Sequence, residues 1–275
     1  MGHAALTIHP DCPKLDSGSM LLAFTGWMDG GEVSTGTVRH LLSNLSAQPI
    51  ATIDPEPFYI VNFPGSMELA AVFRPFVRYD AGVIAEFERP ANTFYCDAAR
   101  NIVLFLGREP NLRWESFADC VFELARQAGV SRIFFVGSFG GSVPHTREPR
   151  LYASVSRPAL KKSLGRYGLQ WTEYEGPASF ATLLLWRAAK LKIDMASIAA
   201  EIPAYLQGPN PRSIESVTRR LASILDLSVD MAAMRLASDE WQDQVTRMVD
   251  KDADLAEKIR KLEEEYDNRL LDAEP

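Results

Sequence analysis

The sequence predicts an α/β fold built on a mainly parallel sheet, with a helical extension at its C-terminal end. Two stretches carry this prediction, residues 20–45 and residues 101–136, because each joins short apolar runs to a segment with helical spacing. A third observation is that no strand pattern is visible beyond Met195. We therefore expect an α/β core over residues 1–195 and a helical extension over residues 196–275, which packs on the core or on a partner subunit.

The first α/β unit begins with Met20–Thr25, an apolar run that is bounded by glycines and is typical of a buried strand. A Gly-rich turn follows this run. We expect a helix over Glu32–Leu45, because its apolar residues recur three and four positions apart.

Residues 50–89 contain strand-like pieces that are separated by prolines. The pieces are Phe58–Val61, Phe76–Tyr79 and Val83–Phe87. Because proline has no backbone N–H to donate to a neighbouring strand, we expect these pieces to form short or edge strands.

The second α/β unit is a strand–helix–strand sequence. Asn101–Leu106 is an uninterrupted apolar run, Arg113–Ala128 has helical spacing and ends before a glycine, and Ile133–Val136 is again apolar. Strands joined in this way are parallel, and their connection is right-handed.

The rest of the chain follows the same patterns. In the core we expect strands at Leu151–Val155 and Trp171–Tyr174 and helices at Arg157–Tyr167 and Ala178–Lys190. A proline-containing linker leads to two further helices, Ser213–Leu225 and Val229–Leu270.

The C-terminal end carries the charge imbalance of the chain. Residues 239–275 contain 13 acidic and 6 basic residues, a net charge of −7 that equals the net charge of the whole chain. The last helix has an apolar, coiled-coil-like seam from Trp241 to Tyr266. Asp252 interrupts this seam, and we interpret it as either a solvated notch or a device that sets the register.

Composition excludes several classes of protein. The acidic balance argues against nucleic-acid binding, and no apolar run approaches the roughly 18 residues needed to span a bilayer. The three cysteines are widely separated, which favours reduced thiols and a cytoplasmic protein. The four histidines form no metal-binding motif, and there is no Gly-Lys, GxGxxG or GxSxG motif, so we expect no metal and no cofactor.

The turn after the first strand is a candidate ligand-binding site. It contains Gly26, Trp27, Asp29, Gly30 and Gly31. Glycines let a backbone approach a ligand closely, and the following helix N-terminus exposes amides to an anion. In the alternative interpretation the glycines form a tight turn, Asp29 caps the helix, and Trp27 is a packing residue or an interface anchor.

A second candidate site is the predicted loop Gly137–Pro149, directly after a buried parallel strand. Its candidate residues are Gly137, Ser138, Gly140, Gly141, His145 and Arg147. Arginine pairs with phosphate or carboxylate, and histidine transfers protons near neutral pH. The alternative is a structural loop held by side-chain hydrogen bonds. If both strands are parallel members of one sheet, the two loops emerge at the same edge and leave a cleft where Asp29, Ser138, His145 and Arg147 converge.

Four segments resemble the proteasome assembly chaperone 2 family, and in particular its bacterial branch. In chain order they are Phe24–Gly31, Val136-Gly137 with Val143–Arg147, Ile202–Leu206 with Pro209–Pro211, and Leu262–Asp267. The resemblance implies a three-layer core with a mixed, mainly parallel sheet, similar to the nucleoside phosphorylase/hydrolase core. It also implies C-terminal helices and self-association into rings, often trimers.

The resemblance implies an oligomeric protein-binding scaffold or chaperone-like protein, with a proteasome-related protein as partner, rather than an enzyme. The alternative is an enzyme that uses the two Gly-rich loops to bind a nucleoside or a phosphorylated metabolite, or that acts as an ATP-dependent carboxylate–amine ligase. Some relatives that dock on the proteasome end in a hydrophobic residue, tyrosine and any residue. This chain ends in Asp272-Ala273-Glu274-Pro275 and its Tyr266 lies nine residues earlier, so we do not expect docking by that route.

Overall fold

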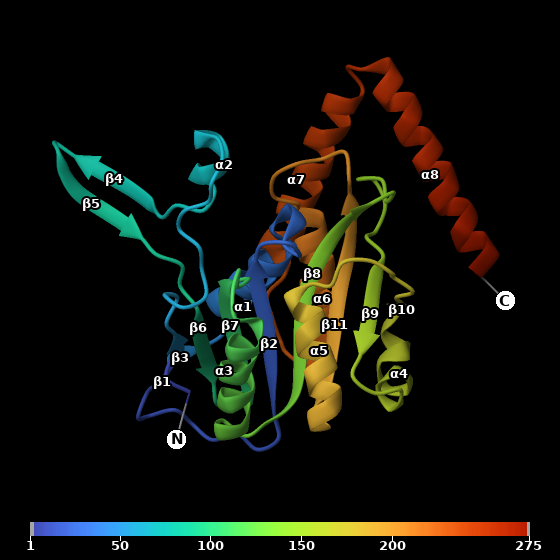
Figure 1. Cartoon of the computed structure of the whole chain (residues 1–275). Helices are drawn as coiled ribbons and strands as arrows, with labels where there is room; N and C mark the ends of the chain where they lie inside the picture. Colours follow the sequence, from blue (N-terminus) through green and yellow to red (C-terminus); the bar gives the residue numbers. More distant parts are fainter. Residues whose placement is uncertain (1–2, 274–275) are drawn as a thin grey trace.

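The computed structural model describes residues 3–273 and contains a nine-stranded sheet with helices on both faces (Figure 1). The strands, in spatial order, are β1 (Leu6–Ile8), β3 (Gln48–Ile53), β6 (Thr93–Asp97), β7 (Ile102–Arg108), β2 (Gly18–Thr25), β8 (Val130–Gly141), β11 (Asp194–Pro203), β9 (Leu151–Val155) and β10 (Gln170–Trp171). The four strands from β7 to β11 are parallel, and antiparallel pairs extend the sheet on both sides. The predicted three-layer α/β class is therefore confirmed.

Each face of the sheet is covered by two long helices. Helices α3 (Trp114–Gln127) and α5 (Phe180–Leu191) pack on one face, and α1 (Val33–Asn44) and α6 (Pro211–Leu225) pack on the other. Short helical turns complete these layers: η1 (Gly30–Glu32), α4 (Ala159–Leu164) and η2 (Gly165–Tyr167).

Strand β2 shows why the sheet is the centre of the fold. Its alternate side chains enter opposite cores, with Met20, Leu22 and Phe24 facing α3 and α5, and Leu21 and Ala23 facing α1 and α6. Burial of a large apolar side chain stabilises the fold by roughly 1.5–3 kcal/mol, so a run that is buried on both faces has no reason to alternate with polar residues. The sheet is thus held by two separate cores.

Strand β11 is the main departure from the predicted elements. It begins at Asp194 and pairs with β8 and β9, so the prediction that no strand lies beyond Met195 is wrong. Its sequence is rich in alanine, which has low strand propensity, and burial on both faces removes any alternation. Pairing on both sides outweighs this weak local preference. Strands β1, β3 and β6 were also not predicted, whereas Phe58–Val61 is not a strand.

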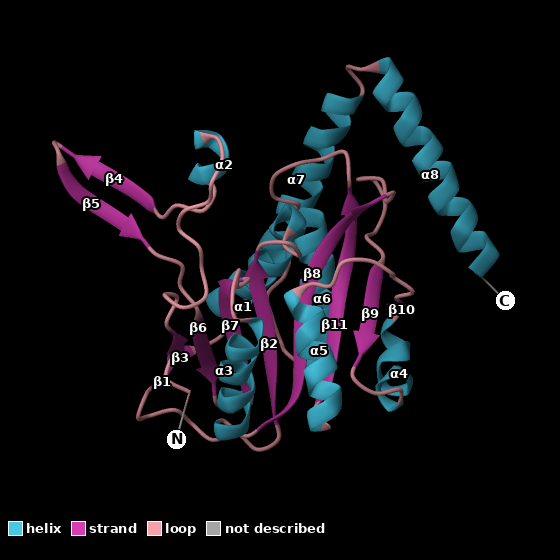
Figure 2. Cartoon of the chain, in the orientation of Figure 1, coloured by secondary structure: helices cyan, strands magenta, loops and turns pink. Residues whose placement is uncertain are grey.

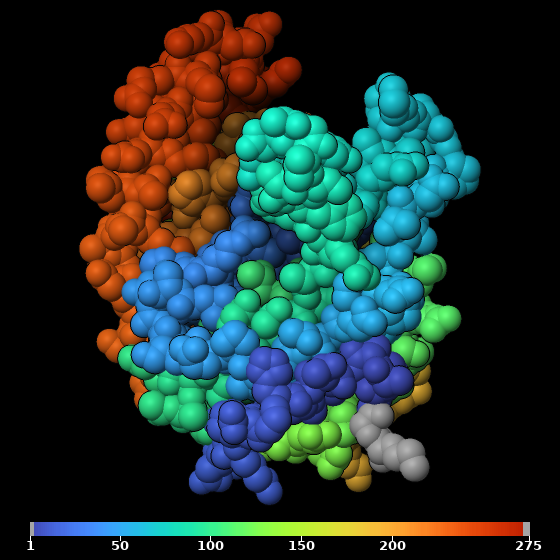
Figure 3. All heavy atoms as spheres, turned by 90° about the vertical axis from the view of Figure 1, so that its left-hand side faces the viewer, coloured from blue at the N-terminus to red at the C-terminus, as the bar shows by residue number. Residues whose placement is uncertain are grey.

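Strands β4 (Phe76–Asp80) and β5 (Val83–Glu88) form a hairpin that is separate from the main sheet (Figure 2). These two strands were predicted, and their turn at Ala81-Gly82 has positive φ at both residues, as tight hairpin turns require. Together with the short helix α2 (Met67–Ala71), the hairpin projects from the body of the molecule (Figure 1), and the space-filling view shows the two as separate lobes (Figure 3).

The C-terminal extension consists of two helices rather than the single one predicted over Val229–Leu270. Helix α7 (Ala232–Val249) extends beyond the carboxyl ends of the strands, and α8 (Ala253–Ala273) runs back (Figure 1). The carboxylate of Asp252 accepts hydrogen bonds from the backbone amides of Asp254 and Leu255, so Asp252 caps α8. Neither interpretation of Asp252 as a notch or a register device describes this role.

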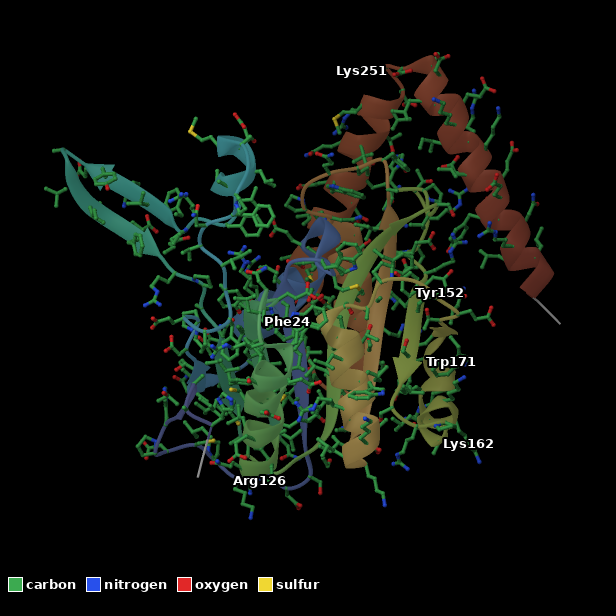
Figure 4. The ribbon with its side chains drawn as sticks, viewed as in Figure 1. Phe24, Arg126, Tyr152, Lys162, Trp171 and Lys251 are labelled. Carbon is green, nitrogen blue, oxygen red and sulfur yellow. The ribbon has the colours of Figure 1, made fainter. Side chains whose placement is uncertain are left out.

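Figure 4 labels the two ends of the molecule. Phe24 lies near the carboxyl end of β2, Arg126 lies at the opposite end on α3, and Lys251 marks the turn between α7 and α8.

Among the helices that the structure describes, none combines the length and the apolar character that a membrane span requires.

Candidate functional site

The two segments predicted to share an edge of the sheet are in direct contact. Strands β2 and β8 are parallel neighbours, so the residues at their carboxyl ends meet. The backbone amide of Ser138 donates to the Met28 carbonyl at 2.8 Å, and its hydroxyl donates to the Gly30 carbonyl at 2.6 Å. Gly137, Ser138, Gly140 and Gly141 nevertheless belong to β8 and not to a loop, because β11 pairs with β8 as far as Gly141.

The glycines of the first turn allow close packing within the chain. Gly31 has φ +64°, and a Cβ atom there would lie 2.8 Å from the Cβ of Asn210. The Asn210 amide also donates to the Gly31 carbonyl at 2.8 Å. A side chain at position 31 would therefore push away the segment that begins α6.

Asp29 anchors the start of α1. Its carboxylate accepts hydrogen bonds from the backbone amide of Thr35 at 3.0 Å and from the Thr35 hydroxyl at 2.9 Å. Burial raises the pKa of Asp29, while the hydrogen bonds from Thr35 oppose that rise. The observed contacts match the structural alternative for Asp29, in which its oxygens serve the helix.

Trp27 has a different environment, because its side chain is 69% exposed. Its backbone amide donates to Oε2 of Glu109 at 2.9 Å, and Oε1 of Glu109 accepts from the amide of Phe180 at 3.0 Å. Glu109, which follows β7, thus joins the first turn to the start of α5. We did not predict this residue, although an acidic residue directly after a buried strand was a usable signal.

His145 is buried and connects the core to the C-terminal extension. Its Nδ1 lies 2.8 Å from the Tyr205 hydroxyl, and its Nε2 lies 3.1 Å from the Thr246 hydroxyl on α7. Burial lowers the pKa of His145, so the neutral ring is favoured in the folded chain.

Arg147 makes the corresponding connection to α8. Its guanidinium donates to both oxygens of Asp267, at 2.9 and 2.8 Å, in a bidentate pair. These hydrogen bonds raise the pKa of Arg147. Tyr266, the residue before Asp267, is buried and donates its hydroxyl to the Glu148 carbonyl at 2.9 Å.

A buried ion pair supports the same edge. Nε of Arg150 lies 2.6 Å from Oε2 of Glu201, and Oε1 of Glu201 accepts from the amides of Ser142 and Val143. Burial alone would raise the pKa of Glu201, but Arg150 and the two amides outweigh it and lower the pKa. Glu201, a carboxylate within the otherwise mostly apolar residues 195–203, was a signal that we did not use.

The side chains of Asp29, Ser138, His145 and Arg147, which we expected to converge, each form hydrogen bonds with a different element. Asp29 bonds to α1, Ser138 to the first turn, His145 to α7 and Arg147 to α8. The pocket beside His145 and Arg147 has a volume of about 10 Å³, and neither Asp29 nor Ser138 lines it. This edge is a junction between elements, and a ligand-binding role for its residues stays a prediction.

The hairpin presents a second candidate, an exposed apolar face. Tyr79 pairs with Ile84 and Val77 pairs with Phe87, so these four side chains share one face of the ribbon, while Arg78 and Glu86 form a salt bridge on the other. Their exposed fractions are 38% for Val77, 61% for Tyr79, 55% for Ile84 and 56% for Phe87. We call these four residues the hairpin face; contiguous apolar surface of this kind is typical of protein interfaces.

Comparison with models of known protein families shows to which family the chain belongs. The family model described as "PAC2 family" matches residues 23–249. The chain belongs to the PAC2 family. The matched range includes both Gly-rich segments and the hairpin, whereas α8 lies beyond it.

Solved structures agree with this PAC2 assignment. A Mycobacterium tuberculosis proteasome-assembly chaperone homologue has 29% identity and a TM-score of 0.76, over 88% of this chain and 99% of that one. A PAC2 family protein from Streptomyces avermitilis has 27% identity and a TM-score of 0.74, over 87% and 98%.

A more distant structure shows the same fold. An archaeal proteasome activator from Pyrococcus furiosus has 18% identity and a TM-score of 0.65, over 90% of this PAC2 chain and 99% of that one. No curated protein matches the chain.

Proposed function

We propose that this PAC2-family chain acts as an oligomeric, chaperone-like protein-binding scaffold in the cytoplasm, with a proteasome-related protein as its partner. The observation that carries the proposal is the exposed hairpin face. The descriptions of the similar structures, a proteasome-assembly chaperone homologue and a proteasome activator, support the class of partner.

The hairpin face favours burial against another chain. A two-stranded hairpin is marginally stable by itself in water, and burying each large apolar side chain contributes roughly 1.5–3 kcal/mol. We infer that a second copy of this chain covers the face. Residues 1–238 carry no net charge and the hairpin carries both signs, so copies of the core do not repel each other. The preferred assembly is a trimer.

Light scattering on the full chain tests self-association. We expect a mass of three times the 30.6 kDa chain for the wild type and a single chain for Ile84→Asp/Phe87→Asp, since buried carboxylates are costly at an interface. Arg78→Gln, on the opposite face of the hairpin, is the matched control and keeps the assembly. A wild-type mass of one chain at micromolar concentration overturns this part of the proposal.

Direct titration with the purified proteasome core particle of the same organism tests the partner. We expect saturable binding that weakens with Trp27→Ala, since an exposed tryptophan is a common interface anchor. Trp186, 53% exposed on α5, supplies the matched control Trp186→Ala. We do not expect docking through a tyrosine near the C-terminus, because Tyr266 is buried. The last two residues of the chain lie outside the described residues. Absence of saturable binding would remove the proteasome from the proposal.

A further inference from the structure

A pocket at the base of the hairpin has an unusual concentration of positive charge. It lies beside the carboxyl ends of β2 and β7 and has a volume of about 390 Å³. Its charged lining consists of Arg39, Arg74, Arg89 and Arg108, with Glu88 as the one acidic residue. These arginines come from four separate parts of the chain: α1, the segment after α2, the segment after β5, and the end of β7.

The arginines of this pocket are poorly neutralised within the chain. Arg39 pairs with Glu32 at 3.1 Å, but both side chains are about half exposed, and such pairs contribute little. Arg74 donates to the Asn62 side chain at 3.2 Å. Within residues 3–273, neither Arg89 nor Arg108 has a carboxylate oxygen within 4.0 Å.

The contrast with the rest of the molecule makes this cluster informative. Within residues 3–271, other arginines such as Arg113 and Arg132 also lack a carboxylate partner, but here four arginines line one pocket of a chain whose net charge is −7. Four guanidinium groups around one pocket repel each other, and a concave surface concentrates their field. An acidic protein gains nothing for its fold from such a cluster, whereas a bound anion would neutralise it.

We propose that this pocket, here called the arginine pocket, binds a small polyanionic metabolite that carries a phosphate ester or several carboxylates. Its volume is within the range of small-molecule sites, and arginine binds both anionic groups through paired N–H donors. The Thr25 hydroxyl adds a neutral donor, while Tyr59 and Leu106 provide a less polar wall for the organic part of the ligand. The guanidinium of Arg108 lies 5.8 Å from the centre of the Tyr59 ring, which keeps it beside this wall.

Calorimetric titration of the full chain with pyrophosphate and with citrate tests the proposal at low ionic strength. We expect saturable binding of at least one probe, weakened about tenfold by Arg89→Gln, because this variant removes a charge-assisted hydrogen bond to the anion. Arg108→Gln should weaken it similarly. Arg260→Gln removes the same charge from an exposed position on α8 and should change the affinity less than about twofold. Circular dichroism checks that each variant is folded, and Arg89, exposed and outside any strand, remains testable if Arg108→Gln does not fold.

The outcomes separate the alternatives. Tighter binding of pyrophosphate assigns a phosphate ester, and tighter binding of citrate assigns a polycarboxylate; either supports the arginine pocket. Lack of saturable binding of both probes overturns it, as does equal affinity in wild type, Arg89→Gln and Arg260→Gln. Binding only to the monomeric Ile84→Asp/Phe87→Asp variant would show that a second copy fills the pocket, which also overturns it. The oligomeric state is measured separately, so failure of the scaffold proposal is distinguishable from failure of this one.

Discussion

Among single residues, Arg150 and Glu201 form a buried ion pair at the carboxyl edge of the sheet. Both side chains are at least nine-tenths buried, and Glu201 also accepts two backbone amides. Arg150→Met leaves the carboxylate buried without its cation, so we expect a loss of about 3 kcal/mol in the free energy of unfolding. Urea denaturation measures this loss.

A variant of an exposed ion pair shows how much of the loss in Arg150→Met is due to burial of the pair. Arg157 pairs with Asp194 at an exposed position, so Arg157→Met should cost less than about 1 kcal/mol. Equal losses for Arg150→Met and Arg157→Met would contradict the assigned role of burial.

Because the pKa of Glu201 is lowered in the folded chain, the stability from its ion pair is present above the pKa of an unfolded glutamate and is lost as pH falls.

His145 gives the junction with α7 a different dependence on pH. Burial lowers its pKa; the carboxylates of Glu263 and Asp250 oppose this shift and Arg212 adds to it. As the pH decreases below about 6.5, the histidine is therefore protonated more readily in the unfolded chain than in the folded chain. The free energy of unfolding then decreases as the pH decreases. We expect the free energy of unfolding to decrease from pH 7.5 to pH 5.5, and to decrease less in His145→Gln. An identical decrease in the variant would assign the effect to other groups.

Among the elements, the α7–α8 pair depends on a cap at its turn. Asp252 accepts from two of the first amides of α8, and loss of such a cap typically costs about 1 kcal/mol. Asp252→Ala should therefore increase amide hydrogen exchange along α8 by several-fold, whereas Asp252→Ser retains an acceptor and should preserve protection. Asp243→Ala, at an exposed position within α7, is the control. Unchanged protection in Asp252→Ala would show that packing alone holds α8.

For the molecule as a whole, the separation of the hairpin from the main sheet predicts that folding and assembly can be uncoupled. Phe76 pairs with Glu88, so a short Gly-Ser linker can replace Phe76–Glu88 without a large gap. We expect this variant to be monomeric and to unfold cooperatively, because no strand of the hairpin pairs with the nine-stranded sheet.

The point variant Ile84→Asp/Phe87→Asp provides the comparison for this excision. Both variants should have the same melting temperature in circular dichroism, since both lose the stabilisation that assembly provides. A markedly lower value for the excision variant, or loss of cooperative unfolding, would show that the core requires the hairpin.

Local patterns in the sequence determined the α/β class, the central strand β2, the strand–helix–strand unit through α3, the hairpin strands and most helices. These elements have a strong apolar periodicity and clear boundaries, and both depend only on residues that are close together in the sequence. The resemblance in four ordered segments led to the PAC2 family, which the match over residues 23–249 confirms.

Tertiary structure alone decided the rest, because the deciding contacts join residues far apart in the chain. Strand β11 exists through pairing with β8 and β9, despite the weak strand propensity of its alanines. His145 and Arg147 looked available for a ligand, yet their partners are Thr246 and Asp267, about a hundred residues away. The arginine pocket likewise draws its lining from residues 25–108. Spacing within one segment carries no information about such partners, since folding brings them together only when the sheet and its helices have packed.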